Sequence, residues 1–244
     1  TWFVFENVYG LTKFKNGEEN IQNHIENRFR DIGYTVKSKI LYASDFGVPQ
    51  RRNRLFIVGN RNGIDFEFPK EFDYSVSVDE AISDLPVLGN GEIQMKGKYT
   101  VPFEQASPYA QLMRKKSKAP TQNIVSRNKD YVVERYKYIG QGENWSSIPD
   151  RLMENYADKK RCHSGIYKRL IGGKPSVVIS NYRKSMLIHP HQDRGLSVRE
   201  AARLQSFPDH FIFEGPVSYV QQQIGNAVPP LLAKAVMKKI LTYK

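Results

Sequence analysis

The chain opens with Thr1-Trp2-Phe3-Val4-Phe5-Glu6-Asn7-Val8, an apolar run interrupted only by one acid and one amide. A run of this kind predicts a short strand that is covered on both faces, as the strands of parallel sheets are. The polar pair lies at the C-terminal end of the strand, which is where open α/β sheets bind ligands. The alternative is that Glu6 caps the following turn and Asn7 helps to close it. The stretch therefore predicts either a site acid or a turn cap.

The composition is that of a folded, basic chain. Its 244 residues are 40% hydrophobic and 12% aromatic, which excludes a chain that is disordered throughout and suffices for one large domain or two modest ones. Lys and Arg number 37 against 25 Asp and Glu, a formal net charge of +12. This excess favours a polyanionic partner. Nucleic acid is favoured over a membrane surface because no basic amphipathic helix stands out.

The number of cysteines and the lengths of the apolar runs bear on the cellular location of the chain. The single cysteine, Cys162, cannot form an internal disulfide, and no run approaches the length of a membrane span, so we expect a cytoplasmic location. Cys162 and His163 are adjacent, but no second Cys-His cluster exists to complete a zinc site. No metal is predicted.

The first 67 residues have the pattern of an α/β sheet. Apolar residues recur at helical spacing from residue 21 to residue 32, and Gly33 then ends the predicted helix: Ile21, Ile25, Phe29, Ile32. Residues 34–42 alternate well enough for a strand, and residues 54–59 form a second, strongly apolar strand. The strand, helix, strand, strand order with short links makes this segment part of an α/β sheet.

The loop before the last of these strands reads Gln50-Arg51-Arg52-Asn53-Arg54. Alternation places Arg52 and Arg54 on one face of the entering strand and Arg51 and Asn53 on the other. Two neighbouring guanidinium groups need an anionic or carbonyl-rich partner. The alternative is a solvated basic turn.

From about residue 68 to residue 190 the sequence is loop-rich, and basic residues interleave with aromatic ones, as in residues 113–118 and 135–138. Such a mixture suits contacts to phosphates and bases, although a solvated charge run is at least as common.

The last segment returns to regular structure. Ser197 and Glu200 have the spacing of a capping box, which predicts a helix that runs through Leu204 and ends at Phe207-Pro208. A final helix is predicted from Val228-Pro229-Pro230 onward, with its apolar side buried: Leu231, Leu232, Ala235, Val236, Ile240. Before it, residues 223–228 predict a small-residue turn that lets a ligand approach the backbone, or an ordinary tight turn.

Four separated segments together resemble the later motifs of the DNA (cytosine-5) methyltransferase family, and they occur in that family's order: Glu6–Val8, Gln50–Arg54, Arg194–Pro208 and Gln223–Pro230. The resemblance implies the C-terminal part of a Rossmann-like S-adenosylmethionine-dependent methyltransferase sheet with an inserted, loop-rich target recognition domain. Residues 1–67 would then be the C-terminal part of the catalytic domain, residues 68–190 the recognition domain, and residues 191–244 the return to the catalytic domain, including the final helix.

The resemblance also implies catalytic roles. The family flips cytosine out of the duplex, attacks C6 with a cysteine thiolate, and moves a methyl group from S-adenosylmethionine to C5. Glu6, followed by Asn7, would hold and protonate N3, which requires a carboxyl that keeps or shares a proton near neutral pH. Arg54 would face O2 of the cytosine, and Arg52 would support the pocket.

Further binding residues follow from the same resemblance. Asn226, Ala227 and Val228 would help to close the cofactor pocket. The predicted DNA contacts are Gln50, Arg169, Lys174 and Arg194. In many family members a Thr follows the Pro of the segment at residue 175, where this chain has Val177-Val178, so a backbone contact by that hydroxyl is not expected.

The family's glycine-rich cofactor loop and its Pro-Cys segment lie upstream of the acid. Cys162 is in no Pro-Cys context and is not assigned as the nucleophile. We therefore expect a fragment, or the C-terminal subunit of a split enzyme in a restriction-modification or phage setting. It would bind double-stranded DNA and depend on an N-terminal half. The alternatives are a catalytically inactive, sequence-selective DNA-binding module and an RNA methyltransferase of the same superfamily.

Overall fold

The structure, a computed structural model, describes residues 1–17, 19–154 and 165–243 and has a mixed α/β fold. The chain divides into two compact units. The first unit consists of residues 1–47, 51–75 and 231–244, and the second consists of residues 48–50 and 76–230. The tripeptide Val48–Gln50 thus belongs to the second unit although both of its flanking segments belong to the first.

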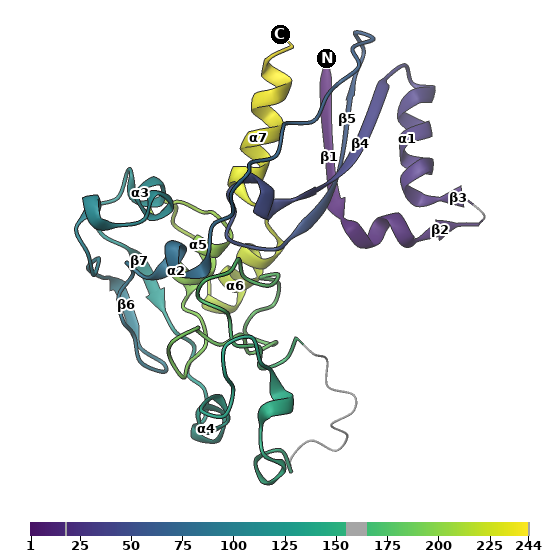
Figure 1. Cartoon of the computed structure of the whole chain (residues 1–244). Coiled ribbons are helices and arrows are strands. Elements are labelled where there is room, and N and C mark those ends of the chain that lie inside the picture. Colours follow the sequence, from purple (N-terminus) through teal and green to yellow (C-terminus); the bar gives the residue numbers. More distant parts are fainter. Residues whose placement is uncertain (18, 155–164, 244) are drawn as a thin grey trace. The chain divides into compact units, whose positions relative to one another are not determined.

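The first unit contains a three-stranded antiparallel sheet. Its strands are β1 (Trp2–Val8), β4 (Thr35–Tyr42) and β5 (Asn53–Asn60), and Figure 1 shows β5 between the other two. The parallel arrangement suggested by the first strand's apolar run is wrong for these strands, because β1 and β4 both pair antiparallel to β5. An apolar run reports coverage of both faces and does not report strand direction.

Aromatic side chains cover β1 on both faces. Phe3 stacks on Phe29 of helix α1 (Ile21–Asp31), with 3.9 Å between ring centroids. The ring centroids of Trp2 and Tyr243 are 5.7 Å apart, and Tyr243 follows the end of helix α7 (Pro230–Leu241). Because neighbouring residues of a strand point to opposite faces, α1 and the C-terminal segment lie on opposite sides of the sheet (Figure 1). Side chains thus lie against both faces of the strand, but Trp2–Asn7 are only half-buried and Val8 is exposed, so the predicted coverage is partial.

The ends of α1 match the sequence signals. The Asn20 side chain accepts a hydrogen bond from the backbone N–H of Gln22 at 2.8 Å, which caps the first turn. Gly33 has φ +85°, the left-handed conformation that suits glycine at a helix end. A small antiparallel pair precedes the helix, β2 (Lys15–Asn16) with β3 (Glu19–Asn20). In α7 the predicted residues Leu232, Val236 and Ile240 are buried, whereas Leu231 and Ala235 are half-buried.

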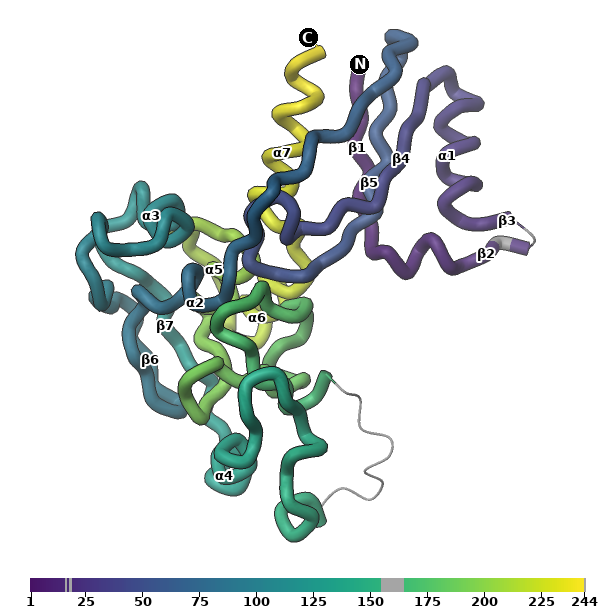
Figure 2. The backbone as a smooth tube through the Cα atoms, viewed as in Figure 1, coloured from purple at the N-terminus to yellow at the C-terminus, as the bar shows by residue number. Residues whose placement is uncertain are grey.

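The second unit is mixed and rich in loops, as predicted for most of it. Strands β6 and β7 pair antiparallel and lie side by side in Figure 2. The regular elements of this unit are β6 (Ile93–Lys96), β7 (Thr121–Ile124), α2 (Val78–Ile82), α3 (Pro108–Arg114), α4 (Asp130–Tyr136), α5 (Val198–Leu204) and α6 (Val217–Asn226).

Helices α5 and α6 test two predictions. The capping box at the start of α5 is confirmed, with both the Ser197 and the Glu200 hydrogen bonds present. The predicted turn over residues 223–228 is corrected, because α6 continues through Gly225 to Asn226 and the chain leaves the helix only at Ala227. Gly225 allows a close approach: a Cβ atom there would lie 2.1 Å from the backbone oxygen of Ser180.

A buried arginine holds α5 in place. Arg203 is fully buried, and its guanidinium group pairs with Asp209 at 2.6 Å and with Asp84, which follows α2, at 3.0 Å. Two carboxylates on one guanidinium group satisfy its charge without solvent. The helix carrying the resemblance to the third motif is therefore fixed by charge as well as by apolar packing.

The compact units do not follow the boundaries predicted at residues 68 and 191. Residues 191–230 group with the segment 76–190, and only residues 231–244 return to the first unit. The predicted boundaries are functional ones, so they stay a prediction. Cys162 and His163 lie outside the residues that the structure describes. Within the described ranges, no helix is long and apolar enough to cross a membrane, and no group of three His, Cys, Asp or Glu could hold a metal.

Candidate functional site

Glu6 and Arg54 form an ion pair on one face of the first unit's sheet. Across β1 and β5, Glu6 lies opposite Phe56 and Val8 lies opposite Arg54, so Glu6 and Arg54 are diagonal neighbours. Their Oε1 and Nε atoms are 2.8 Å apart, with 22% of the Glu6 side chain and 11% of the Arg54 side chain exposed. The pair is therefore mostly shielded but reachable from solvent.

Arg52 adds a second positive charge to this pair. It is 1% exposed, and its backbone oxygen accepts a hydrogen bond from Ala43 at 2.7 Å. Burial and the neighbouring Arg54 lower the pKa of Arg52 to about 10, while Glu6 acts in the opposite direction. Arg52 stays protonated at neutral pH. The structure thus brings Glu6, Arg52 and Arg54 together, and we call these three residues the acid–arginine cluster.

Burial also decides the protonation of Glu6. It raises the pKa of the Glu6 carboxyl, and the lowering by Arg54 and Arg52 does not fully cancel that rise. Burial lowers the pKa of Arg54 as well, against the influence of Glu6. A carboxyl whose pKa is raised beside two guanidinium groups can hold or give a proton closer to neutral pH than an exposed glutamate can.

Asn7 faces away from this cluster. Alternation along β1 puts it on the opposite face from Glu6, and its side-chain oxygen accepts a hydrogen bond from the N–H of Val8 at 2.8 Å. This local bond corresponds to the turn-closing role considered for Asn7. The geometry therefore gives Asn7 no direct contact with the acid–arginine cluster.

The predicted cofactor residues lie together in the second unit, where α6 ends. Asn226 is exposed, and Ala227 and Val228 are half-buried. An exposed carboxamide beside two small apolar residues offers hydrogen bonds and van der Waals contact to a ligand, and the assignment of these residues to the cofactor stays a prediction.

Arg169, a predicted DNA contact, is buried among protein acceptors, and its role at DNA stays a prediction. It is 6% exposed, and its guanidinium group donates to the Asp193 carboxylate and to four backbone carbonyls: Tyr136, Ile139, His189 and Gln192. These acceptors occupy the whole donor edge of the side chain. No part of it is available to a phosphate in this conformation.

Arg194, also a predicted DNA contact, is buried in the same way, and its role at DNA stays a prediction. It is 2% exposed and forms a bidentate pair with Glu200, with Nη1–Oε2 and Nη2–Oε1 distances of 2.9 and 2.7 Å. Its Nε donates to the backbone oxygen of Leu88 at 2.8 Å. Burial raises the pKa of Glu200, but Arg194 outweighs it, with help from His189 and Ser197, and the pKa falls to about 2. The pair therefore stays ionised inside the protein.

The other two predicted DNA contacts differ from each other. Gln50 is fully buried and bonded to protein groups, and its assignment to DNA also stays a prediction. Lys174 is exposed, and its backbone oxygen accepts a hydrogen bond from Val78 at 3.0 Å. Lys174 alone among the four predicted contacts presents its charge to solvent.

With this geometry in view, comparison with known proteins gives the family. A model of the C-5 cytosine-specific DNA methylase family matches residues 1–242. The chain belongs to this family. The resemblance found from four sequence motifs is confirmed.

Relatives agree along nearly the whole chain. The type II methyltransferase M1.HphI of Haemophilus parahaemolyticus is 34% identical over 242 residues, covering 98% of this chain and 56% of that protein. M.DdeI of Desulfomicrobium norvegicum is 33% identical over 264 residues, covering 99% of this chain and 63% of that protein. The chain thus spans little more than half the length of these relatives.

Solved structures support the fold. A protein described as a DNA modification methyltransferase encoded within an Escherichia coli prophage aligns with a TM-score of 0.71 at 22% identity, covering 99% of this chain and 69% of the other. The Entamoeba histolytica methyltransferase EhMeth aligns with a TM-score of 0.55 at 12% identity, covering 99% and 62% of the two chains. At these identities the likeness concerns the fold alone.

One buried residue of a family motif received no role from the sequence. Gln205 is 0% exposed, lies directly after α5, and bonds to Gln50 and to the end of α6. The residue type alone does not show whether a glutamine is buried. The only sequence signal for burial of Gln205 was its position between Leu204 and the predicted helix end at Phe207-Pro208.

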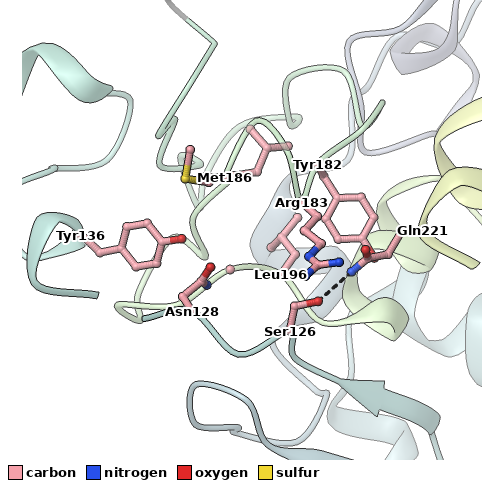
Figure 3. Close-up of a pocket in the computed structure, with 10 residues that line it drawn as sticks. Ser126, Asn128, Tyr136, Tyr182, Arg183, Met186, Leu196 and Gln221 are labelled. Atoms are coloured by element: carbon pink, nitrogen blue, oxygen red, sulfur yellow. Dashed lines mark hydrogen bonds between the residues drawn. The ribbon is translucent and has the colours of Figure 1, made fainter. Parts of the chain in front are cut away.

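A cavity in the second unit is too small to bind a nucleotide or cofactor (Figure 3). Its volume is about 20 Å³, enough for one water molecule. On its wall the Gln221 side chain points toward Ser126 and donates to the Ser126 hydroxyl at 3.0 Å. The cavity is therefore a place for a structural water and no part of the candidate site.

Proposed function

We propose that this chain is the C-terminal part of a DNA cytosine-5 methyltransferase that methylates C5 of a cytosine flipped out of double-stranded DNA. The observation that carries this proposal is the acid–arginine cluster, a shielded Glu6–Arg54 pair beside buried Arg52 in a chain of this family. S-adenosylmethionine would supply the methyl group.

The cluster matches the edge of cytosine that must receive electron density. When a nucleophile adds to C6, negative charge moves toward N3 and O2 of the ring. A protonated Glu6 carboxyl donates to N3, and its raised pKa favours that protonated form. The Arg54 guanidinium group, 2.8 Å from Glu6, then donates to O2 from the same side.

Arg52 acts through charge and position. Its side chain is buried beside Arg54, so its positive charge is little screened by water. In our proposal it stabilises the charge that develops on the base and limits how far the Glu6 pKa rises. A neutral residue of equal size would keep the packing and lose this contribution.

The second unit would contact one side of the cofactor and would bind the DNA. Asn226, Ala227 and Val228 would close one side of the S-adenosylmethionine site, and Lys174 would contact a DNA phosphate. In this proposal, residues 68–190 carry out target recognition. The recognised base sequence would be read by loops of that region.

The nucleophile is proposed to come from sequence outside these 244 residues. Within them there is no Pro-Cys dipeptide. An N-terminal part, in the same polypeptide or in a separate subunit, would supply the cysteine and the glycine-rich cofactor loop that the family resemblance implies.

The test is complementation. The chain is combined with an N-terminal part of a family member that carries the Pro-Cys segment, and transfer of radiolabelled methyl groups to duplex DNA is measured. We expect activity, and we expect Glu6→Gln to lower the rate by about 100-fold or more, because the amide cannot transfer a proton to N3. Glu67→Gln, at a glutamate whose side chain is 74% exposed in the same unit, is the matched control and should keep the native rate.

Two outcomes would count against the proposal. Native activity in Glu6→Gln would remove the role given to Glu6. Sequence-selective, salt-dependent DNA binding with no complementation by any N-terminal part would favour the catalytically inactive binding module instead.

A further inference from the structure

Two buried glutamines of the second unit are joined through their side chains. Gln50 and Gln205 are both 0% exposed, and the Gln50 Nε2 donates to the Gln205 Oε1 at 2.5 Å. Buried amides need all their hydrogen bonds satisfied, and each of these two makes bonds in two directions. We call the pair the glutamine relay.

One end of the relay holds the segment 176–180. The Gln50 Oε1 accepts a hydrogen bond from the N–H of Ile179 at 2.9 Å. Three residues earlier, the N–H of Ser176 donates to the Pro49 oxygen at 3.0 Å. Between these two anchors Val177 and Val178 are 37% and 41% exposed. The segment therefore presents two apolar side chains to solvent on a backbone that is fixed at both ends.

The other end of the relay holds the turn after α6. The Gln205 Nε2 donates to the backbone oxygens of Ile224 at 2.9 Å and Ala227 at 2.8 Å. The last carbonyls of a helix have no partner within the helix, so a side-chain donor there fixes how the chain leaves it. Gln205 thereby positions the end of α6 at Asn226 and the residues Ala227 and Val228 that follow it.

The hydrogen bonds fix the direction of both amides. Ile179 offers only an N–H, so the Gln50 oxygen must face it, and the Gln50 amino group must face Gln205. Two carbonyls face the amino group of Gln205. Replacing either amino group by oxygen would set oxygen against oxygen while leaving the side-chain shape unchanged.

The two segments that the relay joins, 176–180 and the end of α6, also contact each other directly. A Cβ atom on Gly225 would lie 2.1 Å from the Ser180 oxygen, so α6 and the segment 176–180 approach each other at this glycine. A displacement of either segment would therefore press on the other, in addition to straining the relay.

We propose that Gln50 and Gln205 are positioning residues that couple the segment 176–180 to residues 226–228 at the end of α6, so that DNA and S-adenosylmethionine each raise the affinity for the other. The inference rests on the proposed function for the identity of the two ligands: DNA at Lys174 and the exposed residues Val177 and Val178 that follow it, and the cofactor at Asn226–Val228. Such coupling is reciprocal by thermodynamic necessity.

The relay itself is tested by hydrogen exchange on the chain as it is. Gln205→Glu keeps the side-chain shape but replaces the donor to Ile224 and Ala227 by an oxygen. We expect the amide of Ile179, which Gln205 does not touch, to exchange at least about tenfold faster than in the native chain. Gln122→Glu is the matched control, because Gln122 is a buried glutamine of the same unit that donates to Phe213 outside the relay.

Unchanged exchange at Ile179 in Gln205→Glu, or an equal acceleration in Gln122→Glu, overturns the relay. A variant-free measurement covers the case in which Gln205→Glu does not fold. In the native chain, duplex DNA should slow exchange of the Ala227 amide, and no change at Ala227 with saturating DNA also overturns the proposal.

The coupling is tested in the complemented enzyme with S-adenosylhomocysteine as the probe. Its dissociation constant is measured by calorimetry with and without duplex DNA. We expect DNA to tighten binding by about fivefold or more in the native protein and in Gln122→Glu, and by less than about twofold in Gln50→Glu and Gln205→Glu. The double variant should lose no more coupling than either single variant, because both break the same connection.

The inference is contradicted if DNA leaves the dissociation constant of S-adenosylhomocysteine unchanged in the native protein. It is also contradicted if DNA tightens binding in Gln205→Glu as much as in the native protein. A protein that binds neither probe contradicts the proposed function instead, and the Ile179 exchange result still decides whether the relay exists.

Discussion

At the scale of single residues, the partners of each arginine distinguish the acid–arginine cluster, for which we propose a role in catalysis, from Arg169 and Arg194. The Arg54 guanidinium group pairs with one carboxylate, donates to the backbone oxygen of Asn53 at 2.8 Å and stays 11% exposed. Arg169 and Arg194 donate to several carbonyl and carboxylate groups of their own unit and are almost fully buried. Arg54 therefore has fewer protein partners and more exposure to solvent than Arg169 and Arg194.

The charge balance within the acid–arginine cluster is open to direct test. Arg54→Met removes the strongest lowering influence on the Glu6 pKa while keeping side-chain length, so that pKa should rise further above its ordinary value. The carboxyl carbon resonance of Glu6 in an NMR pH titration measures this. Arg51→Met, at an exposed neighbouring arginine, should leave the Glu6 titration where it is. A Glu6 pKa that falls in Arg54→Met would show that burial does not control this carboxyl.

Arg194 and Lys174 should respond to substitution in opposite ways. Arg194→Met leaves the buried Glu200 carboxylate without its bidentate partner, which should cost about 3–5 kcal/mol in urea unfolding. Lys174→Met should change the free energy of unfolding by no more than about 0.5 kcal/mol, because the side chain is exposed. DNA affinity measured against salt concentration should show a shallower slope for Lys174→Met. A large stability loss in Lys174→Met would contradict this division.

The sequence predicted the acid–arginine cluster and could not predict the other arginines. Alternation predicted Arg52 and Arg54 on one face, and Arg52 lies directly before β5, which begins at Asn53. The link from these arginines to Glu6 came from the family resemblance. Arg169 and Arg194 lie in loops, where no repeating geometry links spacing to direction. Their basic, loop-rich surroundings are typical of DNA contacts, and the carbonyls that satisfy them come from residues distant in sequence.

At the scale of elements, tertiary contact overrides local propensity in α6. The predicted capping box of α5 needs only residues 197–200 and was found where expected. Helix α6 contains Gly225 and Asn226, which locally favour a turn, and its N-cap is Pro216 with no side-chain cap. The Ser180 backbone packs so closely against Gly225 that no Cβ atom would fit there, and nothing local in the sequence signals that approach.

Gly225→Ala should therefore destabilise the protein. Alanine is favoured over glycine inside a helix by about 1 kcal/mol, but its Cβ would lie 2.1 Å from the Ser180 oxygen, and backbone cannot yield as a flexible side chain can. A lowered melting temperature in calorimetry is expected. Gly173→Ala is the control, because a Cβ atom on Gly173 would have no neighbouring atom within 4 Å. A stabilised Gly225→Ala variant would mean that the contact relaxes at little cost.

At the scale of the whole molecule, stability should depend on pH through buried His189. Burial lowers its pKa to about 4; Glu200 and Asp79 oppose this shift, while Arg194 and His191 add to it. An unfolded histidine binds a proton below about pH 6.5, whereas the folded chain resists it until about pH 4. The free energy of unfolding should therefore fall as the pH drops from 6.5 to 4, by up to about 1.4 kcal/mol per pH unit.

Urea unfolding between pH 7 and pH 4 measures this dependence. His189→Asn should flatten the curve in that window, because asparagine has no proton to gain. His191→Asn, at an exposed histidine paired with Asp79, should leave the slope nearly unchanged. A slope that persists in His189→Asn would assign the pH dependence to other groups.

The placement of Val48–Gln50 in the second unit also bears on exchanging recognition regions between relatives. A protein engineer who moves residues 76–230 into another family member transplants Gln205 and Ile179 together, but leaves behind the tripeptide that carries Gln50. In the chimera, the Gln205 side-chain oxygen and the N–H of Ile179 then lack the hydrogen-bond partners that Gln50 provides, and the host protein must supply them. Chimeras should consequently be built with four junctions instead of two, or only into hosts that have glutamine at the position of Gln50.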